Sequence, residues 1–214
     1  KHNWIMCWLY LGTFGSFIGY AAGFPLLIKS QFPGINALQF AWLGPLVGAV
    51  IRPFGGWLAD KLGGASVTFW NVVVMAAAVV GVLYYLPSGG SGGSFPGFLT
   101  MFLILFLTTG IGNGSTFRMI PVIFATERTR EAAGKGKRVE EQALKDGNKE
   151  AAAVLGFSSA VGAYGGFFIP RSYGTSISMS GGPEWALYVF LAFYLSCIVT
   201  TWWFYVRKRA QMPC

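Results

Sequence analysis

Long apolar runs separated by short polar breaks dominate the pattern along this chain. Six of the runs approach or exceed the roughly 20 residues that an α-helix needs to cross the hydrocarbon of a bilayer. We place them at about residues 4–29, 38–60, 66–86, 97–125, 151–170 and 185–206. The pattern therefore predicts an all-α transmembrane protein built as a bundle of six helices.

The breaks between the runs differ in length and composition. The segment PSGGSGGSFPG before the fourth run is rich in Gly and Ser, and we interpret it as a natural flexible loop, with an engineered linker as the alternative. The stretch 126–150 is long and polar, and its Ala, Glu and Lys content favours a surface helix over part of it. We interpret 126–150 as a cytoplasmic loop that serves as a solvated connector, with a regulatory or lipid-contacting role as the alternative.

Composition supports the membrane assignment and narrows the chemistry. Hydrophobic residues make up 54% of the chain and charged residues only 11%, whereas a soluble domain is about a quarter charged. The three cysteines, Cys7, Cys197 and Cys214, have no disulfide or metal spacing, and His2 is the only histidine. We therefore expect no metal, no cofactor and no enzymatic activity.

The positive charge is distributed unevenly between the two ends of the predicted spans. Twelve basic residues fall on one side, namely Lys1, Lys61, the seven from Arg128 to Lys149, and the three at 207–209, whereas only Lys29 and Arg171 fall on the other. Loops rich in Lys and Arg stay in the cytoplasm, so both termini are expected there. This topology explains the net charge of +8 without a nucleic-acid partner.

Two arginines, Arg52 and Arg118, lie inside predicted spans, while all eight acidic residues lie at span ends or in loops. A charge at bilayer depth costs about 2.5–3.5 kcal/mol on insertion scales and usually faces the bundle interior or a watery cavity. Arg52 is eight residues from Asp60, roughly 12 Å along a helix, which is too far for a direct pair. Arg118 is closer to its span end, and we interpret it as structural or gating, with substrate binding as the alternative.

Three kinds of group can compensate Arg52: a carboxylate from outside this chain, backbone carbonyls at a helix break, or an anionic ligand. The planar, forked guanidinium suits a small planar oxyanion. Snorkelling, or satisfaction by carbonyls alone, is the structural alternative. Prolines and glycines recur in the same spans, as a moving bundle requires, although tight packing would produce the same pattern. They include Pro25, Pro45, Pro53, Pro121, Gly15, Gly19, Gly23, Gly44 and Gly48.

The stretch GGWLADKLGG, residues 55–64, resembles the loop signature of the major facilitator superfamily. Gly56, Asp60, Lys61 and Gly63 match the signature, while the basic residues that commonly follow it are replaced by Gly64 and Ala65. The resemblance implies that Asp60 holds one conformation by interacting with a neighbouring helix end. An ordinary exposed terminal charge is the alternative.

Three longer stretches resemble the nitrate/nitrite porters of that superfamily: RPFGGWLADKLGG, GIGNGSTFRMIPVIF and GFSSAVGAYGGFFIPRSYG. The last is similar to their glycine-rich signature, except that the Ala163-Tyr164 pair stands where the stricter signature has Asn. The resemblance implies the C-terminal six-helix half of a twelve-helix fold in the bacterial inner membrane. Because half of a two-fold cavity would leave Arg52 facing lipid, we expect an N-terminal six-helix half upstream, carrying a matching arginine.

By the same resemblance, Arg52 is one of two arginines that grip the anion. It also implies that Tyr10 and Phe14 lie over the anion and that Gly165 and Gly166 let a helix backbone approach it. Since Tyr10 and Phe14 are four residues apart on one helix face, simple core packing is the alternative for them.

The resulting functional prediction is alternating-access transport of nitrate and nitrite, in which one anion is exchanged for the other. The exchange follows from the absence of an intramembrane carboxylate that could carry a proton and from the charge of an empty arginine site. Proton-coupled nitrate symport and another small-anion carrier stay open as alternatives. A sugar or drug carrier also stays open, although the predicted site, with one Arg and several aromatic residues, fits these substrates less well. The non-transport alternatives are a membrane-anchor subunit of a respiratory complex, which should show histidine ligands or an acidic quinone site, and a scaffold bundle.

Overall fold

The computed structural model describes residues 2–87, 92–207 and 210. Within that part of the chain, six helical segments are long and apolar enough to cross a membrane, which confirms the predicted all-α transmembrane fold. Four residues of the predicted flexible break before the fourth span, 88–91, lie outside the described residues.

Several of the six spans consist of more than one helix. The elements in order are α1 (His2–Tyr10), a π-helical turn (Leu11–Gly15), α2 (Ser16–Gln31), α3 (Ala37–Phe40), α4 (Leu43–Leu62), α5 (Gly64–Tyr85), α6 (Phe95–Ala132), α7 (Lys137–Ala163), α8 (Gly165–Ser180), α9 (Glu184–Thr201) and a second π-helical turn (Trp202–Val206).

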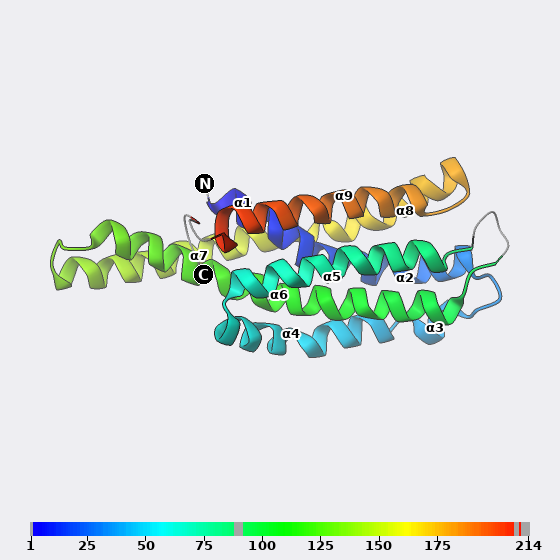
Figure 1. Ribbon diagram of the computed structural model, residues 1–214, viewed down its shortest axis with the longest axis horizontal. Helices are drawn as coiled ribbons and strands as arrows, with labels where there is room; N and C mark the ends of the chain where they lie inside the picture. Colours follow the sequence, from blue (N-terminus) through cyan, green and yellow to red (C-terminus); the bar gives the residue numbers. More distant parts are fainter. Residues whose placement is uncertain (1, 88–91, 208–209, 211–214) are drawn as a thin grey trace.

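The helix ends follow local rules. The Asn36 side chain accepts from the backbone N–H of Leu38 at 3.1 Å and so caps α3. Gly63 ends α4 with φ at +87°, a backbone conformation that favours glycine, which accounts for one glycine of the loop signature. These turns let consecutive spans run back and forth along one axis, as Figure 1 shows.

The fourth span is the centre of the bundle. α6 packs against α4, α5 and α7, while α2 packs on α8 and α5 on α9. Away from the charged end, α2 and α6 share an aromatic core in which the Phe24 and Phe102 ring centroids are 5.0 Å apart. Phe98 and Phe106 extend the same cluster and are fully buried.

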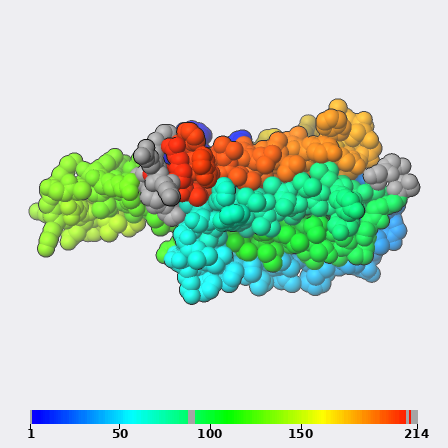
Figure 2. Space-filling model, viewed as in Figure 1, coloured from blue at the N-terminus to red at the C-terminus, as the bar shows by residue number. Residues whose placement is uncertain are grey.

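A helical hairpin projects from one end of the bundle and contains most of the stretch 126–150. α6 continues to Ala132 and α7 begins at Lys137, so only a short turn with Gly134 and Gly136 at positive φ interrupts the helices. Figures 1 and 2 show these green segments extending beyond the other helices. The two legs are joined where Arg128 Nε donates to Glu150 at 2.8 Å. The connector is thus largely helical.

The first and last described helices meet at the hairpin end. His2 Nδ1 lies 3.1 Å from the Tyr205 hydroxyl, and the turn between α4 and α5 is at this end too. Lys61, the basic residues of the hairpin and Arg207 therefore share one end, as the charge pattern predicts. Lys1, Lys208 and Arg209 lie outside the described residues.

Candidate functional site

Glycines bring α4 and α6 into backbone contact at the level of Arg52. A Cβ at Gly55 would meet the backbone of Ile111, and a Cβ at Gly114 would meet the carbonyl oxygen of Arg52. Because no side chain separates the two helices there, Asn113 of α6 lies directly beside the guanidinium of Arg52.

Asn113 links three helices through its side-chain amide. With the amide oxygen turned toward Arg52, it accepts from Nη2 at 3.0 Å and from Nε at 3.1 Å. The amide nitrogen then donates to the Tyr10 hydroxyl at 3.1 Å. Both Tyr10 and Asn113 are buried. A polar network therefore ties α1 and α6 to the arginine of α4.

Aromatic rings of the first span surround the same guanidinium. The Tyr10 and Phe14 rings are stacked with centroids 5.2 Å apart, so the two residues do share one face. Arg52 Cζ lies 5.8 Å from the Phe14 centroid and 5.1 Å from that of Phe17, within the range of cation–π attraction. Phe14 belongs to the π-helical turn Leu11–Gly15, and such turns are frequent at functional sites.

A cavity of about 530 Å³ opens beside Arg52. It reaches from Tyr10 and Arg52 to Asp60, near the end of α4, and to Arg118, in the middle of α6. The residues that line it are Tyr10, Arg52, Pro53, Gly56, Trp57, Asp60, Asn113, Gly114, Phe117 and Arg118. The structure thus gathers both membrane arginines around one cavity, with Tyr10, Asp60 and Gly56 from the predicted set.

Asp60 and Arg118 form an ion pair that joins the end of α4 to α6. Their side chains are 50% and 54% exposed, so the pair lies at the mouth of the cavity. Beside it, Lys61 Nζ lies 4.2 Å from the centroid of the Trp57 ring. The membrane arginine interpreted as gating and the acidic residue of the loop signature are therefore direct partners.

Gly165 and Gly166 serve a different contact in this structure. A Cβ at Gly165 would meet the backbone of Gly15, and one at Gly166 would lie 2.7 Å from Ile18 Cγ2. Neither glycine is among the residues that line the Arg52 cavity. They bring the fifth span against the first, beside the π-helical turn that carries Phe14.

The charge of Arg52 has no carboxylate counterpart among the described residues, since the ion pairs found there involve Arg118 and Arg128. The amide oxygen of Asn113 solvates the guanidinium but leaves its net charge in place. A half-buried charge of this kind creates a demand for an anion. No cluster of three or more potential metal ligands occurs in the described ranges.

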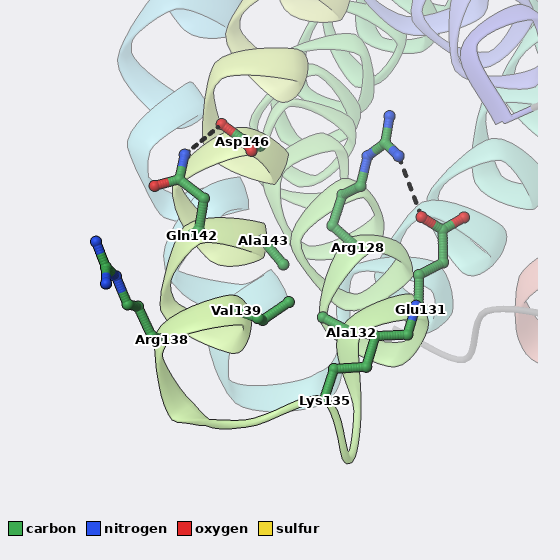
Figure 3. Close-up of a pocket in the computed structure, with 9 residues that line it drawn as sticks. All are labelled: Arg128, Glu131, Ala132, Lys135, Arg138, Val139, Gln142, Ala143 and Asp146. Atoms are coloured by element: carbon green, nitrogen blue, oxygen red, sulfur yellow. Dashed lines mark hydrogen bonds and ion pairs between the residues drawn. The ribbon is translucent and has the colours of Figure 1, made fainter.

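A larger cavity of about 830 Å³ lies between the two legs of the hairpin, as Figure 3 shows. Its lining mixes both signs of charge: Arg128 Nη1 donates to Glu131 at 3.1 Å, and the Gln142 amide donates to Asp146 at 3.0 Å. The other basic residues of this lining, Lys135 and Arg138, are exposed on the projecting hairpin, whereas Arg52 is half-buried within a membrane span.

The sequence analysis missed Asn113, Phe17 and the pairing of Asp60 with Arg118. An amide between two glycines in mid-span, in GNG, is the signal that marks Asn113. Phe17 follows Phe14 by three residues, a spacing that places both on one helix face. Two opposite charges at matching depth in neighbouring spans were the available sign of the ion pair.

Comparisons with known proteins agree with this architecture. No family model matches the chain. The nitrate/nitrite transporter NarU of Salmonella typhimurium (strain LT2) is 47% identical over 210 residues, covering 98% of this chain and 45% of that protein. NarU of Escherichia coli (strain K12) is 48% identical over 208 residues, covering 97% and 45%. The probable nitrate/nitrite antiporter NarK2 of Thermus thermophilus is 36% identical over 219 residues, covering 100% and 44%.

The chain spans about half the length of the curated relatives that it matches. The similarity extends over nearly every residue of the chain and includes the α4 and α6 stretches that form the cavity. On this evidence, the chain is a multi-pass membrane protein that is similar, over nearly its whole length, to about half of proteins named as nitrate/nitrite transporters.

Proposed function

We propose that the full-length protein carries nitrate and nitrite across the bacterial inner membrane by alternating access, exchanging one anion for the other. The observation that carries this proposal is Arg52, a half-buried membrane arginine beside a cavity. Aromatic rings and an amide surround it, and no carboxylate of the described residues pairs with it. A planar oxyanion supplies the missing negative charge and fits the guanidinium fork. The relatives named as nitrate/nitrite transporters support that choice of anion.

The charge balance of the cavity favours exchange. Asp60 is the one carboxylate among the lining residues, and it is already paired with Arg118. An empty carrier would have to reorient with the Arg52 charge uncompensated, which is costly in a low-dielectric environment. Return with a second bound anion avoids that cost. No chemical change of the anion is needed, so the protein acts as a carrier and not as an enzyme.

The second half of the site comes from outside this chain. We propose that an N-terminal six-helix half faces the cavity and contributes a second arginine to the bound anion. The present chain is then the C-terminal half. Rocking of the two halves about the anion would open the cavity to each side of the membrane in turn.

The ion pair Asp60–Arg118 is the proposed latch on the hairpin side. Gly55 and Gly114 allow the close approach of α4 and α6, whereas a Cβ at Gly56 would make only an ordinary contact with the Gly114 oxygen, at 3.9 Å. Gly63 provides the sharp turn that follows. Lys61, seated over Trp57, fixes the end of α4. We propose that this end and both termini are cytoplasmic, because the basic residues gather there.

Uptake of labelled nitrate into vesicles preloaded with nitrite, with buffer or with nothing tests the proposal. The full-length protein would be compared with Arg52→Lys, which keeps the charge but loses the fork. Arg171→Lys is the matched control, because Arg171 is an exposed arginine on α8 that does not line the cavity. We expect uptake that requires internal nitrite, that falls about a hundredfold in Arg52→Lys and that persists in Arg171→Lys.

Two results would contradict the proposal. Uptake that follows a pH gradient whatever the internal anion would replace exchange by proton coupling. Uptake that survives Arg52→Lys would make this arginine structural and leave the anion site elsewhere.

A further inference from the structure

The contact between Asn113 and Arg52 uses one particular edge of the guanidinium. An arginine has five N–H groups: one on Nε and two on each Nη. The Asn113 oxygen accepts from Nε and Nη2, which form the side edge of the fork. The described residues supply no other acceptor to Arg52, so its terminal edge, formed by Nη1 and the second N–H of Nη2, is left for a ligand.

The neutrality of the Asn113 side chain matters as much as its position. An amide oxygen orients the guanidinium without cancelling its charge, whereas a carboxylate at the same place would form an internal ion pair. That pair would compete with any anion in the cavity. Because Asn113 also donates to Tyr10, the same amide fixes the hydroxyl and the stacked ring pair that cover the arginine.

We propose that Asn113 is a positioning residue that occupies the side edge of Arg52 and so presents the terminal edge to a planar oxyanion. The inference rests on the proposed function, since it assumes that Arg52 binds the transported anion. Asn113 itself acts through Arg52 and Tyr10, and its absence would leave the charge in the cavity but release the orientation of the fork.

Equilibrium binding of nitrate to the purified full-length protein, measured by calorimetry, separates these roles. Asn113→Leu keeps the size of the side chain and removes the amide. Asn71→Leu is the matched control, because Asn71 is another buried amide, on α5, that donates to the Thr108 carbonyl at 2.8 Å and does not line the Arg52 cavity. Asn113→Asp keeps the shape and adds a negative charge.

Loss of a hydrogen bond to a charged group lowers an equilibrium constant by roughly tenfold or more. Asn113→Leu should therefore weaken nitrate binding by about tenfold or more at every pH. Asn71→Leu should stay within about threefold of the wild-type affinity, because it removes no contact of the cavity. Asn113→Asp should bind nitrate weakly throughout the range from about pH 5 to pH 8, since a carboxylate paired with the Arg52 guanidinium stays ionised there and competes with nitrate. The wild-type protein should bind nitrate more tightly across the same range.

Wild-type affinity in Asn113→Leu would overturn the positioning role, and so would undiminished affinity in Asn113→Asp. Equal losses in Asn113→Leu and Asn71→Leu would also overturn it, by showing a general effect of removing a buried amide. Failure of the proposed function looks different, because the wild-type protein would then bind neither nitrate nor nitrite.

Discussion

At the scale of single residues, the two membrane arginines are accommodated in opposite ways. Arg118 is paired with Asp60 at the mouth of the cavity. Arg52 lies deeper and has aromatic faces and an amide oxygen around it, none of which carries a negative charge. The first arrangement can hold two helices together without a ligand, whereas the second leaves a positive charge that the proposed anion would neutralise.

Tyr10 is the residue whose role the binding data would decide most directly. Tyr10→Phe keeps the ring stacked on Phe14 and removes the hydroxyl that contacts Asn113. If the hydroxyl supports the anion site, nitrate affinity should fall about three- to tenfold, the value of one hydrogen bond, with the transport rate at saturation little changed. Isothermal titration of the purified protein measures the affinity. An unchanged affinity would show that Tyr10 serves only in core packing, which is the alternative given in the sequence analysis.

The residue scale also shows what a single sequence reveals of such a site. Arg52 is easy to identify in the sequence because charged residues are rare within apolar membrane spans. Its contacts are not conspicuous: Asn113 is 61 positions away along the chain, and nothing in local periodicity pairs the two residues. The resemblance to a transporter family pointed to Tyr10 and Phe14, which the structure places beside Arg52, and to Gly165 and Gly166, which it places in a helix contact instead.

At the scale of helices, the α4–α6 contact determines where the site forms. Glycines on both helices replace side chains at the crossing, so the backbones touch and the Arg52 and Asn113 side chains meet along one edge of the contact. Tight packing is thus a condition for the polar geometry. The sequence analysis gave a moving bundle and tight packing as two interpretations of the recurring glycines. The two are compatible, because the close contacts lie within one half of the proposed transporter and the proposed movement is between the halves.

Gly110→Ala tests this helix contact without touching the cavity. A Cβ at Gly110 would meet the carbonyl oxygen of Gly48, a backbone atom that cannot turn away. Overpacking of this kind should destabilise the fold by about 1–3 kcal/mol, seen as a lower midpoint of thermal unfolding in detergent. Gly156→Ala on α7 is the control, because its Cβ would point into open space. Equal midpoints for the two variants would refute the predicted contact.

The Asp60–Arg118 pair should affect access to the cavity more than stability. Exposed ion pairs contribute about 0–1 kcal/mol, so Asp60→Asn should leave the unfolding midpoint nearly unchanged. The same energy shifts a two-state equilibrium by up to about fivefold. Alkylation of a cysteine introduced as Phe117→Cys, which lines the cavity, should therefore become faster from the hairpin side by up to that factor. The exchanged pair Asp60→Arg with Arg118→Asp should restore the slow rate; a rate unaffected by any of these changes would exclude a latch.

Helix boundaries show where the hydropathy pattern stops being informative. The described residues form six spans, as the apolar runs predicted, but α6 continues to Ala132 and α7 begins at Lys137, well inside the stretch interpreted as a connector. Hydropathy reports where a helix leaves the hydrocarbon, whereas the Ala, Glu and Lys residues beyond that point still favour helix. The π-helical turn Leu11–Gly15 had no visible signal, because it depends on packing that involves distant spans.

At the scale of the whole molecule, the hairpin and the opposite end should face different compartments. Cysteines introduced as Lys135→Cys, near the hairpin turn, and Ser178→Cys, on α8, are both at exposed positions. With other accessible cysteines replaced, a membrane-impermeant maleimide should label Ser178→Cys in intact cells and Lys135→Cys only in inverted vesicles. The native Cys7 and Cys197 are buried and should contribute little background. The reverse pattern would invert the proposed topology.

The continuity of α6 has one more consequence. A single helix of 38 residues, about 57 Å long, carries Asn113 in the cavity and then runs on into the hairpin. Any rotation of this half is therefore magnified at the hairpin turn, as displacement grows with distance from a pivot. The hairpin therefore moves farther than the residues around the cavity when this half rotates. One fluorophore or spin label on the hairpin and another on the proposed N-terminal half would report this movement. The distance between the two labels, measured in a membrane during transport, would reveal rearrangements of less than a nanometre around the site.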